Sequence, residues 1–139
     1  MRRAVLLVLL LSACTQTPPA TEAPAGLVGP TWQLVRFRGG DDKVVVPGDR
    51  TSYTLAFRAD GTVSARIDCN RGHGGYQLAG KNRIEFGPMA ITRAMCPPGS
   101  MHDHVVRQLP YIRSYVIKDG HLFLSLMADA GTYEFEPLR

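Results

Sequence analysis

Alternating apolar and polar side chains, the pattern of half-buried strands, run through most of the chain after residue 30. The clearest hairpin joins residues 53–57 and 63–67 through Asp60-Gly61, a pair that accepts the positive φ of tight turns. Asp119-Gly120 separates two more apolar runs in the same way. The pattern predicts about eight short strands, at residues 32–37, 53–57, 63–67, 75–78, 83–86, 111–118, 121–127 and 132–136.

One segment changes to a helical period. Met101, Val105 and Leu109 are four residues apart and form a single apolar helix face. Ser100 is a candidate cap at the start of this helix, and Pro110 should end it. Eight antiparallel strands and one helix predict an α+β fold that is mostly antiparallel β. We expect a curved sheet or partly open barrel with the helix covering one face or end.

The N-terminus has the layout of a bacterial secretory signal. Arg2 and Arg3 precede an apolar run over residues 4–11, which is too short to span a bilayer. The sequence Leu11-Ser12-Ala13-Cys14 resembles a lipobox, which implies removal of residues 1–13 and lipid modification of Cys14. An ordinary signal with a chance cysteine is the alternative.

Residues 14–29 contain Cys14 and a Pro-rich stretch with no aromatic side chain, which predicts a flexible tether to a folded domain over residues 30–139. The residue after the lipidated cysteine is Thr15 rather than Asp. By resemblance to Gram-negative lipoproteins, this implies anchoring in the outer membrane, with the domain facing the periplasm. In a Gram-positive host the same segment would hold the domain outside the plasma membrane.

Composition and charge narrow the function classes. The 139 residues are 45% hydrophobic and 20% charged, which suits one globular domain. The formal charge of +4 includes Arg2 and Arg3, and without them 14 Lys and Arg stand against 12 Asp and Glu, a charge of +2. Nucleic-acid binding needs a concentrated basic face. We therefore expect no nucleic-acid partner.

Four short motifs follow one another in the middle of the chain. They are Asp68-Cys69-Asn70-Arg71, Gly74-Gly75-Tyr76, Phe86-Gly87-Pro88-Met89-Ala90 and Thr92-Arg93-Ala94-Met95-Cys96. Their order resembles the META domain family, typified by the bacterial heat-shock protein HslJ, and the resemblance covers residues 30–137. It implies a META-type α+β fold, an envelope setting and a link to stress tolerance, but no reaction.

Two cysteines remain once Cys14 is lipidated. In an oxidising compartment Cys69 and Cys96 should form a disulfide. Two free buried thiols, or a metal-binding or catalytic thiol, are the alternatives. A redox pair is disfavoured, because such pairs prefer a Cys-x-x-Cys spacing at a helix start.

Other chemistry finds little support in the sequence. There is no Gly-x-Ser-x-Gly nucleophile motif, and Glu134 with Glu136 is most simply a solvated strand edge. His102 and His104 are two residues apart on the expected helix and so face apart, which disfavours a zinc site. We therefore expect no enzyme activity, metal or cofactor. The remaining histidines, His73 and His121, are interpreted as solvated.

A polar, Gly-rich turn follows Cys69. Asn70, Arg71 and His73 form a possible binding loop, although a structural role is the favoured interpretation of Asn70 and Arg71. The leading hypothesis is a non-enzymatic envelope lipoprotein that is held at the membrane by Cys14 and binds an unknown envelope protein or small ligand in stress tolerance or maintenance. The alternative is a periplasmic small-ligand-binding or lysozyme-inhibitor-like module that uses the loop Arg71–Gly75.

Overall fold

The computed structural model describes residues 26–139. The expected signal peptide, Cys14 and most of the expected tether lie outside the described residues. Among residues 26–139, no helix is both long and apolar enough to cross a membrane.

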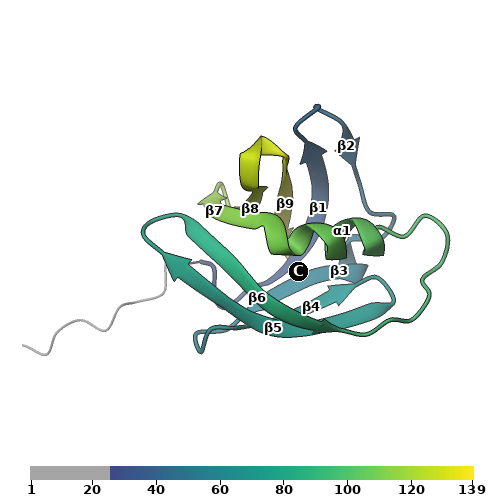
Figure 1. Ribbon diagram of the computed structural model, residues 1–139, viewed down its shortest axis with the longest axis horizontal. Helices are drawn as coiled ribbons and strands as arrows, with labels where there is room; N and C mark the ends of the chain where they lie inside the picture. Colours follow the sequence, from purple (N-terminus) through teal and green to yellow (C-terminus); the bar gives the residue numbers. More distant parts are fainter. Residues whose placement is uncertain (1–25) are drawn as a thin grey trace, which may run out of the picture.

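The described chain forms a closed antiparallel barrel with a short helix (Figure 1). Strand order is β2-β1-β3-β4-β5-β6-β7-β8-β9, and β9 pairs again with β1, so that β1 and β3 to β9 close a ring and β2 extends it at one edge. This confirms the mostly antiparallel α+β fold. The strands are β1 (Thr31–Gly39), β2 (Val44–Val45), β3 (Tyr53–Phe57), β4 (Thr62–Ile67), β5 (Asn70–Ala79), β6 (Arg83–Ile91), β7 (Ile112–Lys118), β8 (His121–Leu126) and β9 (Gly131–Pro137).

The ring is weakest between β6 and β7. These strands share one register position, Arg83↔Ser114, and the Tyr115 N–H donates to the Asn82 carbonyl at 2.8 Å. Beyond this point they separate, and the helix α1 (His102–Gln108) lies along the side of β6 that has lost its partner (Figure 1). The 3-10 turn η2 (Leu109–Tyr111) connects α1 to β7. The helix therefore covers the opening in the barrel.

The helix packs through the face that the sequence predicted. Met101, Val105 and Leu109 are all buried, and the Met101 N–H donates to the Tyr53 hydroxyl at 2.8 Å. The cap differs slightly from the prediction, because Ser100 Oγ accepts the His102 N–H at 3.1 Å one residue before the helix cap. The chain continues past the α-helix through Pro110 as η2, since proline is tolerated in the first turn of a new helical segment.

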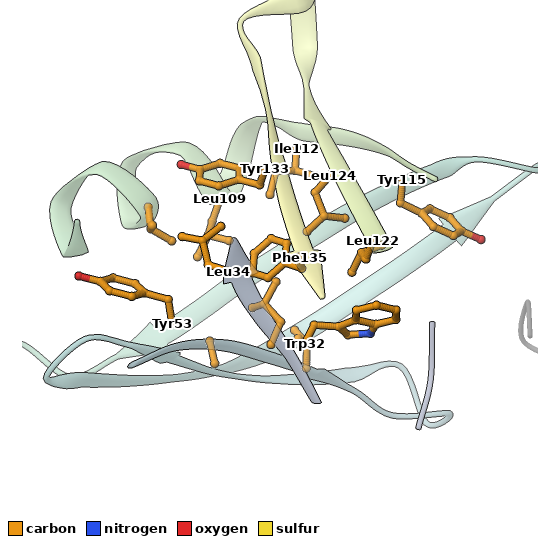
Figure 2. Packing of buried hydrophobic residues seen from close by; sticks show 14 of the residues in the cluster. Trp32, Leu34, Tyr53, Leu109, Ile112, Tyr115, Leu122, Leu124, Tyr133 and Phe135 are labelled. Carbon is orange, nitrogen blue, oxygen red and sulfur yellow. The ribbon is translucent and has the colours of Figure 1, made fainter. Parts of the chain in front are cut away.

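The hydrophobic core fills the barrel and begins earlier in the chain than the sequence indicated (Figure 2). Leu27 is 0% exposed, and its carbonyl accepts the indole N–H of Trp32 at 3.0 Å. Val28 forms an isolated parallel β-bridge with Phe57. Apolar contacts of Leu27 and Val28 therefore bring the last residues of the expected tether against the core of the domain.

Strand β1 departs from strict alternation. Trp32 and Leu34 point into the core, and the register against β9 then shifts between Leu34 and Arg36. This bulge turns Phe37 inward, although alternation from Trp32 placed it on the opposite face. The bulge bends β1 as the barrel closes.

The central hairpin is longer than the sequence predicted. Strand β5 starts at Asn70 rather than Gly75, and β6 continues to Ile91 rather than ending at Phe86. Gly72 and Gly74 lowered the apparent strand propensity, yet the strand needs them. A Cβ on Gly74 would lie 2.8 Å from Met89 Cγ and 2.9 Å from the Pro88 carbonyl oxygen. The missing side chain lets β6 approach closely.

Candidate functional site

A disulfide and a buried asparagine fix the loop that follows β6. Cys69, in the tight β4–β5 turn, is bonded to Cys96 with a Cα–Cα distance of 5.4 Å. Asn70 is 0% exposed. Its Oδ1 accepts the Ala94 N–H at 2.7 Å and the Thr92 hydroxyl at 2.8 Å, and its Nδ2 donates to the Ala94 carbonyl at 2.9 Å. We call these five residues the Asn70 cluster.

The Asn70 cluster explains two of the sequence motifs. The residues around Cys69 and those between Thr92 and Cys96 lie far apart in the chain but form one joint. Two hydrogen bonds between Arg71 and Thr92 complete it, because the Arg71 N–H donates to the Thr92 side-chain Oγ1 and the Thr92 N–H donates to the Arg71 carbonyl, both at 3.0 Å. Asn70 therefore has the structural role that the sequence favoured.

The expected binding loop is a strand. Asn70 is buried, whereas Arg71 and His73 are exposed on β5 and paired with β4 at Arg66 and Ser64. Regular pairing with β4 and β6 overrides the glycine content of this segment. The proposed inhibitory loop Arg71–Gly75 is therefore not present as a loop.

The Phe86–Met89 motif forms a bulge in β6, which stays paired with β5 on both sides of it. Opposite β5, Tyr76 pairs with Phe86 and Gly74 pairs with Met89, so β6 carries one extra residue in this interval. Pro88 lies inside the bulge, where its missing N–H removes no ladder bond. Beyond the bulge, Met89 and Ile91 of β6 line the same hollow as Val106 of α1, and β6 has no pairing with β7 there.

A long groove lies between β6 and α1. One hollow of about 640 Å³ is lined by β6, the loop 92–100 and the start of α1, and a second of about 450 Å³ extends it towards Pro110. Met89, Ile91 and Val106 line both hollows. We call this the β6–α1 groove. The groove was not predicted from the sequence, although a proline within a strand pattern indicates an edge strand.

Among residues 26–139, the hollow bordered by core side chains of the barrel is much smaller. The hollow bounded by Leu34, Tyr53, Val105 and Phe135 holds about 20 Å³, enough for about one water molecule. A small ligand inside the barrel, one form of the alternative hypothesis, is therefore unsupported. The groove outside the barrel is the candidate functional site.

The polar side chains at the start of α1 make local contacts with one another. Ser100 Oγ accepts a backbone N–H from His102 and lies 3.4 Å from the Tyr53 hydroxyl, while the His102 ring contacts Asp103 at 3.0 Å. In residues 26–139, these contacts do not join hydroxyl, imidazole and carboxylate in a catalytic relay. The same residues contain no group of three or more His, Cys, Asp and Glu side chains placed to hold a metal ion.

Glu134 is buried, contrary to its interpretation as a solvated edge residue. Strand β9 pairs on both sides, and Glu134 is 9% exposed on the outer surface of the barrel. Its carboxylate contacts Arg36 Nε at 2.6 Å and His121 Nδ1 at 2.8 Å. His121 is thus a hydrogen-bond partner of Glu134 rather than a solvated histidine, and this cluster lies apart from the residues that line the groove.

His104 should make stability depend on pH. Its ring lies against Phe37, with centroids 4.6 Å apart. Burial, with a smaller effect of the Arg107 charge, lowers the pKa of His104 below 6.5. As pH falls below about 6.5, the unfolded chain therefore takes up a proton before the folded one does, and stability decreases. We expect His104→Gln to reduce this loss between pH 7.5 and 5.5 in urea unfolding.

The matched control for His104 is His73→Gln, which removes an exposed imidazole of β5 in place of one packed against the core. Equal pH slopes for the wild-type protein and His104→Gln would contradict the assignment.

Comparisons with known proteins agree with this fold. The sequence pattern of the META domain matches residues 25–137. An NMR structure of a protein from Burkholderia xenovorans is similar, with a TM-score of 0.67 and 21% identity over 94% of this chain and 99% of that one. A crystal structure of a DUF4847 family protein from Bacteroides vulgatus has a TM-score of 0.59 and 18% identity over 79% and 93%. The comparison with curated proteins gave no significant match.

Proposed function

The chain belongs to the META domain family, and we propose that it is a non-enzymatic lipoprotein of the cell envelope that acts by binding, in envelope stress tolerance or maintenance. The observation that carries this proposal is the β6–α1 groove, a long and partly apolar surface held by the Asn70 cluster. Ligand sites are typically concave with apolar walls and a few polar groups. The part of this groove that extends towards Pro110 is mostly apolar, and the part beside loop 92–100 adds polar and charged groups.

Two features support the envelope setting. The lipobox-like sequence ending at Cys14 supports a lipid anchor. The Cys69–Cys96 disulfide suits an oxidising compartment such as the periplasm, because thiols in the cytosol are kept reduced. Two or more acyl chains on Cys14 would hold the protein stably at a membrane.

The loop at one end of the groove and the point where the chain enters the domain lie at opposite ends of the molecule (Figure 1). Gly26 lies beside Ile117 of β7, so that an added Cβ would be 3.3 Å from Ile117 Cδ1. In Figure 1 the first described residues (purple) are at the left, and the loop between β6 and α1 is at the right. A membrane anchor on Cys14 would leave the groove open to the periplasm.

The intact mass of the protein extracted from its own cell membranes tests this setting. We expect a mass equal to residues 14–139 plus acyl groups, rising by about two mass units when the disulfide is reduced. The same protein after mild removal of ester-linked acyl chains is the control, and it should lose only their mass. An unmodified full-length mass would overturn the lipoprotein proposal.

A further inference from the structure

We propose that the β6–α1 groove binds an extended peptide segment of a partner protein, which adds as an antiparallel strand to the free edge of β6. The inference rests on the proposed function, since it names the partner chemistry of the same site. Strand addition of this kind uses main-chain hydrogen bonds for affinity and alternate side-chain contacts for specificity.

The backbone of β6 provides the hydrogen-bonding groups. The Thr92 N–H points to β5, where the Arg71 carbonyl accepts it. Because backbone groups in a strand alternate in direction, the N–H and C=O of Ile91 and Met89 point to the opposite side, into the groove. Within residues 26–139, no other element accepts from or donates to these groups. A peptide backbone would complete them, whereas an acyl chain would leave them unpaired.

The side chains of the groove suit a strand with alternate apolar residues. Met89 and Ile91 are two residues apart on β6 and pack half-buried against the core, and Val106 of α1 faces them across the groove. Met95, which is 98% exposed, stands at the rim. Methionine adapts to varied partners, so apolar side chains at every second peptide position can pack here.

The bulge at Pro88 limits what can pair with β6. A proline and a bend on an edge strand prevent a long sheet-to-sheet contact, which disfavours a second copy of this chain as the occupant. The groove is closed along one side by α1, which leaves room for one strand rather than a sheet. A short peptide segment satisfies both conditions.

The charges at the end of the groove predict where the bound segment carries an acidic residue. Arg93 lines the groove just after β6 and has no ion-pair partner among the described residues. Asp103 on the opposite wall already contacts His102. Because an antiparallel segment starts where β6 ends, we expect an acidic residue near the N-terminal end of the bound peptide.

Site-specific photo-cross-linking in cells that make this lipoprotein tests the proposal. A photo-reactive residue replaces the fully exposed Met95 at the groove, or exposed Met127, Val116 or Val46 elsewhere on the domain. We expect a partner protein to cross-link from Met95, at a segment with alternate apolar residues that follow an acidic one. Arg93→Glu should lower the yield several-fold, whereas Lys81→Glu, in the exposed β5–β6 turn, should not.

A synthetic peptide of the cross-linked segment then separates strand addition from simple apolar contact. It should shift the NMR amide signals of Met89 and Ile91, and methylating the peptide amides that face β6 should weaken binding about tenfold. Methylating the amides that point away should have little effect.

The outcomes separate this inference from the proposed function. Cross-links only from Met127, Val116 or Val46 would leave a binding function intact and overturn the groove as its site. Cross-links from Met95 to a phospholipid or to a second copy of this chain would overturn the peptide assignment. Absence of cross-links from all four positions would overturn both the inference and the proposed binding function.

Discussion

Replacing Asn70 by Ala should lower the free energy of unfolding by about 3 kcal/mol, because three side-chain hydrogen bonds of about 1 kcal/mol each are lost. The bonds link Asn70 to the Ala94 N–H, the Ala94 carbonyl and the Thr92 hydroxyl. Since Asn70 is fully buried, the vacated space is also shielded from water. Urea denaturation of the oxidised protein at neutral pH measures the change.

The control for Asn70 is another asparagine of the same hairpin. Asn82 lies in the exposed β5–β6 turn, and in the part of the chain that the structure describes its side chain has no hydrogen-bond partner. Asn82→Ala should change stability by less than about 0.5 kcal/mol. A loss below about 1 kcal/mol for Asn70→Ala would mean that the loop is held by the disulfide alone.

The Asn70 result also bears on the proposed peptide groove. Loop 92–100 forms one wall of the groove, and the Asn70 cluster is what positions it. A loosened wall would pay more conformational entropy on binding. We therefore interpret the motif around Asn70 as support for a surface rather than as the surface itself.

The sequence predicted the fold better than the site, for physical reasons. The hairpin of residues 53–57 and 63–67 and the helix face of Met101, Val105 and Leu109 were predicted correctly, because local periodicity reports directly on burial. The first half of β5 was not predicted as a strand, because it contains glycines. Their missing side chains allow a close contact with β6, which only the folded chain shows.

The groove could not be predicted, because it lies where β6 and β7 do not pair with each other. Strands β6 and β7 follow each other around the barrel, yet they meet at one register position and then separate. Strand β6 then carries an extra residue near Pro88, and the effect of such a bulge on the path of a strand depends on its partner strand. Likewise, Glu134 appeared solvated in sequence because its burial comes from Arg36 and His121 on neighbouring strands.

Removing the disulfide should have an effect as large as that of Asn70. The chain-entropy model gives about 3.5 kcal/mol for the loop closed by Cys69 and Cys96, which are 27 residues apart. We expect this loss of unfolding free energy for the double variant Cys69→Ala/Cys96→Ala. Adding a reductant to the wild-type protein should give a similar loss and leave the double variant unchanged, which controls for the two substitutions themselves.

Hydrogen exchange should show which segments open more easily when the disulfide is removed. The amides of loop 92–100 should exchange faster in the double variant, while those of β3 and β4, which pair at five successive positions, should follow global stability alone.

Asn70 Nδ2 lies 3.4 Å from both sulfur atoms, so the two halves of the cluster are in contact. Combining Asn70→Ala with the double variant should therefore cost less than the sum of the separate losses, because contacting residues are not additive. Full additivity would show that the disulfide and Asn70 hold the loop independently.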